Sequence, residues 1–140
     1  MASTMTNAGA AGLSSGGTIT WASDTIKARL CTGGTFNKDD TSMTGKTAAT
    51  GSTDITVTTK AKTTDTTNDR IVFDFDDLSF TGLSDTNSAV QIAIYKFVTD
   101  DAGSTPIAYI DITDQALTGA TTANYAVPAG ATLGAFYLQQ

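Results

Sequence analysis

Two side chains on which enzymes commonly depend are missing from this chain. Its 140 residues include no histidine, and all 14 acidic residues are aspartate, so glutamate is absent as well. Histidine and glutamate supply many of the general acids, general bases and metal ligands of enzymes. Their absence argues against an enzyme. We therefore assign no catalytic, cofactor-binding or metal-ligating residue, and we expect no cofactor.

Cysteine and long apolar runs are also scarce. Cys31 is the sole cysteine, so no intrachain disulfide can form. It follows Leu30 in a strand-like segment, where a free cysteine usually packs as a small apolar residue. No run approaches the roughly 20 apolar residues of a membrane-spanning helix, and the N-terminus lacks the features of a signal peptide. We expect a protein used in a cytoplasm, or released from it as part of a particle.

Charge is sparse and unevenly placed along the sequence. Charged residues make up 16% of the chain and the net charge is −6, which argues against nucleic acid or an anionic membrane as the main partner. Of the eight basic residues, only Lys96 lies in the second half. Such asymmetry suits a head-to-tail arrangement of copies. Because folding mixes the two halves, we favour charges simply spread over the surface.

Threonine, by contrast, fills 28 positions, and the apolar residues follow a strand pattern. Apolar and polar residues alternate in 25–31, 54–60 and 70–76, whereas 89–98 and 106–112 are apolar on both faces. Gly, Asp, Asn and Thr turns separate these runs. About eight short strands with such turns predict an all-β protein, an antiparallel β-sandwich of jelly-roll-like form.

The domain organisation follows from composition. Residues 1–17 contain mainly Ala, Ser, Thr and Gly, which predicts a flexible N-terminal arm, either disordered or ordered only against a neighbouring subunit. Residues 18–140 form a single β-sandwich domain. A long loop at 32–53 interrupts it, and Phe36 and Met43 are suited to pin that loop to the body or to a partner.

Several groups of side chains raise the question of a site. Asp74, Asp76 and Asp77 resemble a carboxylate pair for acid–base chemistry, but their place at the end of a strand favours a solvated turn. Calcium is a further possibility for the Asp-rich loops, although none has the spacing of a known calcium loop. The last possibility is an aromatic platform for sugar binding. Most of the candidate aromatic residues lie in or beside strands, where packing in the core is a commoner role than sugar binding. The Asp-rich loops are 39–40, 76–77 and 100–101, and the aromatic candidates are Trp21, Tyr95, Tyr109, Tyr125 and Tyr137.

Four segments, taken in chain order, resemble small virion proteins of tailed bacteriophages. Residues 21–30 (W-A-S-D-T-I-K-A-R-L) resemble the opening W-x-S-D-T-I-K-x-x-L of such proteins. Residues 68–77, 91–96 and 106–111 resemble their later segments N-x-R-(I/V)-x-F-D-A-D-D, A-V-I-Y-K and L-I-A-Y-I-D. The resemblance spans residues 18–140. This chain departs from it in its Thr- and Gly-rich arm and its extended loop.

The resemblance implies a non-enzymatic capsid decoration, or cement, protein. Such a protein binds the outer surface of the icosahedral head and stabilises contacts between capsomers of the major capsid protein. The resemblance also implies a homotrimer of β-sandwich subunits, and strands 89–98 and 106–112 are candidates for its self-contact surface. The alternative is a tail- or fibre-associated virion protein, adhesin-like, that binds a host-surface glycan.

Overall fold

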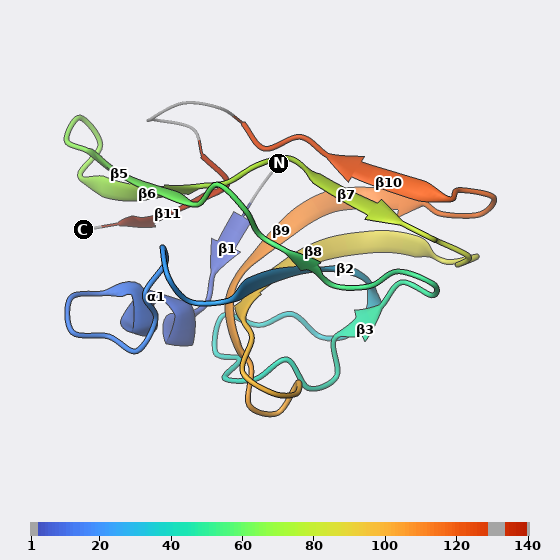
Figure 1. The fold of residues 1–140 in the computed structure, drawn as a ribbon, viewed down its shortest axis with the longest axis horizontal. Coiled ribbons are helices and arrows are strands. Elements are labelled where there is room, and N and C mark those ends of the chain that lie inside the picture. The colour runs from blue at the N-terminus through green and yellow to red at the C-terminus, as the bar shows by residue number, and fades with distance from the viewer. Residues whose placement is uncertain (1–2, 129–133, 140) are drawn as a thin grey trace.

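The structure, a computed structural model, describes residues 3–128 and 134–139, which form an almost entirely β protein (Figure 1). The described residues contain eleven strands and one short helix. The first part of the chain forms β1 (Ser3–Met5), α1 (Asn7–Leu13), β2 (Ile26–Gly33), β3 (Thr47–Ala48), β4 (Ile55–Thr56) and β5 (Ala61–Asp65). The second part forms β6 (Arg70–Asp74), β7 (Leu78–Thr81), β8 (Ser88–Lys96), β9 (Thr105–Ala116), β10 (Thr122–Tyr125) and β11 (Phe136–Gln139).

The strands form two layers. One is a six-stranded sheet in the order β1-β9-β8-β2-β3, with β4 also paired to β2. The other consists of two small sheets, β10-β7 and β11-β6-β5, which lie across the large sheet (Figure 1). The strand pairs are antiparallel. The prediction of an antiparallel all-β sandwich is thus confirmed, whereas its jelly-roll form stays a prediction.

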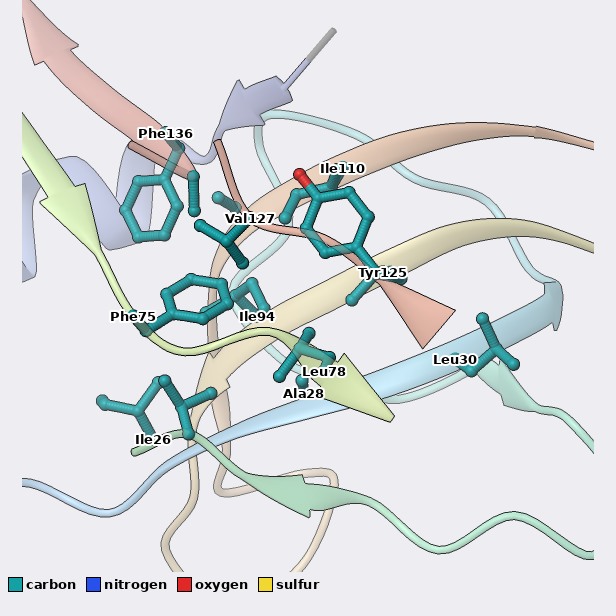
Figure 2. Packing of buried hydrophobic residues seen from close by; sticks show 14 of the residues in the cluster. Ile26, Ala28, Leu30, Phe75, Leu78, Ile94, Ile110, Tyr125, Val127 and Phe136 are labelled. Atoms are coloured by element: carbon teal, nitrogen blue, oxygen red, sulfur yellow. The ribbon is translucent and has the colours of Figure 1, made fainter. Parts of the chain in front are cut away.

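The main core lies between the layers. Alternate residues of each strand point to the same face, so Ile26, Ala28 and Leu30 of β2 face inward and are at most 2% exposed. Figure 2 shows them opposite side chains of the other layer. At one end, the Trp21 ring meets the Phe73 and Phe136 rings edge-on, with centroids 5.3 and 5.4 Å apart.

The N-terminal segment is ordered against its own chain, so the expected flexible arm is wrong for residues 3–13. β1 pairs with β9, and the Thr6 amide donates to the Ile107 carbonyl at 2.9 Å. The Thr6 hydroxyl accepts from the Gly9 amide and donates to the Pro106 carbonyl, which joins the start of α1 to β9. Backbone hydrogen bonds, Leu13 in the main core and Met5 packed against it hold this segment. Two isolated apolar residues give no strand or helix pattern in the sequence.

The long loop has a defined role in the fold. β2 continues to Gly33, so the loop spans 34–54, with β3 inside it, and it crosses the outer face of the large sheet. Met43 is fully buried there, in a second cluster with Cys31, Ala93, Tyr95 and Tyr109.

The second cluster explains why 89–98 and 106–112 are apolar on both faces. Ala93, Tyr95 and Tyr109 are at most 3% exposed because the loop of the same chain covers them. Part of the face expected to supply a self-contact surface is therefore covered by the subunit's own loop. Self-contact through these strands stays a prediction.

Candidate functional site

The most highly connected polar side chain of the structure is Arg29, on the outer face of β2. Its guanidinium contacts Asp54 at 2.7 Å and Asp101 at 2.8 Å, and it donates to the Lys46 carbonyl at 3.1 Å. Each carboxylate accepts two parallel hydrogen bonds, the strongest geometry for this pair. The hydrogen bonds from Arg29 hold the pKa of Asp101 below its ordinary value. Arg29 thereby joins the middle and the C-terminal end of the 34–54 loop to the turn after β8.

A second ion pair lies within the same loop. Lys46 is almost fully buried, contacts Asp40 at 2.8 Å and donates to the Thr35 carbonyl. The Tyr109 hydroxyl donates to Asp40 at 2.7 Å. Burial raises the pKa of Asp40, but hydrogen bonds from Lys46, the Asn37 amide and Tyr109 outweigh it, so the net direction is downward. We call Arg29, Lys46, Asp40, Asp54 and Asp101 the loop clamp.

The loop clamp includes an aspartate from two of the three loops that were candidates for calcium binding. Asp40 and Asp101 are engaged by Lys46 and Arg29. Their neighbours are engaged too, since Asp39 pairs with Lys38 and Asp100 accepts the Gly103 amide. Within residues 3–128 and 134–139, no group of three or more Asp or Cys side chains is placed to hold a metal ion.

The acidic run after β6 also holds loops together. Asp76 accepts from the hydroxyls of Thr58 and Thr59, and Asp77 accepts the Val127 amide at 2.8 Å. These carboxylates and Asp74 line an open hollow beside Phe75. Asp74 ends β6, and Asp76 and Asp77 lie between β6 and β7, where the sequence predicted a turn. Each of the three serves as a hydrogen-bond acceptor.

The aromatic candidates for sugar binding divide into two groups. Trp21, Tyr95, Tyr109 and Tyr125 are buried, as their strand positions predicted. Tyr137 is 46% exposed, and the Arg70 guanidinium lies over its ring at 4.8 Å from the centroid.

Cys31 behaves as a core residue. It is fully buried in the second cluster, as the sequence predicted. Burial raises the pKa of its thiol to about 12, so the thiol is protonated at neutral pH.

The described surface is hollowed in two further places. A cleft of about 230 Å³ opens between the layers, lined by apolar side chains such as Leu30, Ile92 and Phe80, with Gln115 and Asn124 beside them. Two adjoining hollows of about 330 and 390 Å³ lie between the end of α1 and the β11-β6-β5 sheet. We call the latter pair the α1 groove. The sequence did not predict it, because its lining comes from residues 13–22, 60–73 and 138–139, which only the fold brings together.

Comparisons with known proteins add no assignment to this geometry. The chain matches no protein-family model, no curated protein and no solved structure. Among the described residues, no helix is long and apolar enough to cross a membrane.

Proposed function

We propose that this protein is a non-enzymatic decoration protein of a tailed-bacteriophage head. It binds the outer surface of the icosahedral shell and stabilises contacts between capsomers of the major capsid protein. The observation that carries the proposal is the loop clamp. It fixes a long surface loop to the body of the subunit through Arg29 and the Tyr109 hydroxyl, which suits a protein whose product is a stiffer assembly.

Rigid loops favour this role for an energetic reason. Binding costs free energy whenever a loop must be ordered at the interface, so a loop ordered beforehand leaves more of the contact energy for affinity. A decoration protein repeats modest contacts around a symmetric particle, and multivalency then replaces a deep pocket. The clamped 34–54 loop would provide the ordered contact surface, and repeated binding of subunits around the particle would provide the multivalency.

The segments that resemble phage virion proteins supply much of the framework. Trp21, Ile26 and Leu30 of the first segment are buried, as is Phe73 of the second. Tyr95 and Tyr109, from the third and fourth, carry the second cluster and bind the loop clamp through their hydroxyls. Because the shared residues are framework residues, the resemblance supports a similar fold more directly than a similar binding surface.

The proposal includes a homotrimer. The subunit's own loop covers Ala93, Tyr95 and Tyr109 on the outer face of the large sheet, so these three side chains are not available for a trimer contact. The exposed large apolar residues that the structure describes are Val98 and Tyr137, which form no continuous apolar surface. A trimer of this subunit therefore uses mainly polar contacts and is strengthened by binding to the shell.

Glycan binding by a tail- or fibre-associated protein is the second candidate, and Tyr137 is the observation that favours it. An exposed aromatic ring is a common platform for sugars. Arg70 lies over that ring, and Tyr137 is still 46% exposed. Binding of the recombinant protein to a glycan array, lost in Tyr137→Ala, would favour this candidate.

Copy number separates the two functions. We expect densitometry of purified virions to find on the order of hundreds of copies of the chain per particle, since decoration repeats over the shell. The major capsid protein on the same gel provides the internal standard. A count of tens or fewer would contradict decoration and support a tail position.

A further inference from the structure

The α1 groove lies where the β11-β6-β5 sheet projects beyond the main core, at the same end of the molecule as α1 (Figure 1). Cross-strand partners share a face, so Lys62, Phe73 and Phe136 form one row across the sheet. Phe73 and Phe136 of this row pack on Trp21 and are at most 1% exposed.

The next row behaves differently. It contains Thr64, Ile71 and Leu138, which are also cross-strand partners on the same face. Ile71 and Leu138 are only partly buried, and together with Leu13 they line the outer hollow. The groove therefore has an apolar floor that the subunit's own side chains leave incompletely covered.

The charge of the groove is unusual for this chain. Its lining includes Lys60 and Lys62 and no aspartate, although the chain carries a net charge of −6. Lys60 donates to the Asp24 carbonyl. Lys62 is exposed and has no hydrogen-bond or ion-pair partner among the residues that the structure describes.

The other described hollows differ in this respect. Three aspartates and no basic residue line the hollow after β6. No charged residue lines the cleft between the layers. Among these hollows, a free cation beside an apolar floor occurs in the α1 groove.

We propose that the α1 groove is the docking site for an acidic, apolar segment of the shell protein. An apolar side chain of that segment packs on Leu13, Ile71 and Leu138, and a neighbouring carboxylate pairs with Lys62. The inference rests on the proposed function for the identity of the partner. It rests on charge complementarity and the uncovered row for the chemistry of the segment.

The negative charge of the rest of the subunit increases the preference of an acidic segment for the α1 groove. Like charges repel an acidic segment from the aspartate-rich parts of the surface, so the two lysines favour its contact with the groove. A basic segment would be drawn to the aspartate-lined surfaces instead. The groove thereby determines where on the subunit an acidic segment binds.

The first test uses two synthetic peptides that carry the same pair of leucines, flanked by aspartates in one and by lysines in the other. Each is titrated into the full-length protein while amide chemical shifts are followed by NMR. We expect the acidic peptide to shift amides of 13–17, 60–62, 71 and 138, and Lys62→Glu to weaken its binding about tenfold or more. Lys38→Glu makes the same charge change at an exposed site away from the groove and should leave binding unchanged.

Three results would overturn the groove as this site. They are an acidic peptide that binds elsewhere or not at all, equal binding of the lysine peptide, and equal weakening by Lys62→Glu and Lys38→Glu. Thermal unfolding of both variants checks that they are folded. Leu138→Ser provides a second variant, because it should weaken peptide binding without changing charge.

The second test separates the groove from the proposed function. Virion shells lacking this protein are incubated with wild type, Lys62→Glu and Lys38→Glu, and bound protein is measured after sedimentation. We expect Lys62→Glu alone to lose occupancy. Equal shell binding by all three proteins overturns the groove and leaves decoration intact. A wild-type protein that fails to bind shells overturns decoration, and with it the shell as partner.

Discussion

Replacing Arg29 by methionine tests the loop clamp most directly. Methionine keeps much of the side-chain length and removes the guanidinium, so Asp54, Asp101 and the Lys46 carbonyl all lose a donor. The change leaves the apolar clusters in place. The variant therefore reports on the charged network rather than on the core.

The magnitude follows from the exposure of each partner. The side chains of Arg29 and Asp54 are 11% and 18% exposed, so this pair is close to the buried class, in which removal of one partner costs about 3–5 kcal/mol. Asp101 is 45% exposed, and its pair with Arg29 contributes at most about 1 kcal/mol. Tyr95 still donates to Asp54 at 2.6 Å, which lowers the cost of leaving that carboxylate behind. We expect a loss of about 3 kcal/mol in the free energy of unfolding.

Urea unfolding of wild type and Arg29→Met measures this difference. For a domain of this size, about 3 kcal/mol corresponds to a fall in Tm of roughly 10 °C. Hydrogen exchange should rise first in residues 34–54, because the clamp fixes that loop. Lys38→Met provides the control, since its pair with Asp39 has both side chains 62% exposed and should change stability by less than about 0.5 kcal/mol. A loss below about 1 kcal/mol for Arg29→Met, or unchanged exchange in the loop, would refute the clamp as a stabilising unit.

Two further perturbations test the acid sensitivity and the N-terminal segment. Backbone amides of Thr50 and Asn87 hold the pKa of the Asp85 carboxyl at about 2. The stabilisation by the Asp85 carboxylate is therefore present above its unfolded pKa and is lost as pH falls from about 4 toward 2. Asp85→Asn should flatten the pH dependence of the free energy of unfolding in that window, and an unchanged slope would contradict this. A Cβ at Gly9 would lie 2.5 Å from the Ile107 carbonyl oxygen. Gly9→Ala should therefore detach α1, lower the free energy of unfolding by about 1–3 kcal/mol and open residues 14–18 to proteolysis. Gly33→Ala is the control, because its Cβ would make only ordinary contacts and should change neither stability nor proteolysis.

The sequence predicted the parts of the fold that depend on alternation. β2, β8 and β9 lie close to the expected runs, because each has an apolar face buried in the main core. The run at 54–60 predicted a longer strand than the two residues of β4. Val57 continues the apolar alternation because it is buried, although it lies outside the strand itself. β1 and β3 had no apolar alternation to find, because they contain only three and two residues and are identified by their backbone pairing with β9 and β2.

The candidate surfaces were harder to predict, for a different reason. Phe36 and Met43 indicated that the loop is pinned, and both contact the second cluster. The partners of Arg29 lie 25 and 72 residues away in the sequence, so no local pattern reveals that two carboxylates share one guanidinium. Ion pairs of this kind depend on the layering of the fold, which alternation does not encode.

The loop clamp and the α1 groove place two limits on how this subunit meets a partner. Because the 34–54 loop covers the apolar outer face of the large sheet, separation of that loop would expose Tyr95 and Tyr109 and break the Arg29–Asp54 ion pair and the Tyr109–Asp40 hydrogen bond. Recognition by the large sheet is therefore energetically disfavoured. The row at Ile71 and Leu138 needs no such rearrangement, since it is already partly exposed beside a free lysine. A partner that binds without disturbing the folded subunit is accordingly expected at the end where α1 and the β11-β6-β5 sheet meet.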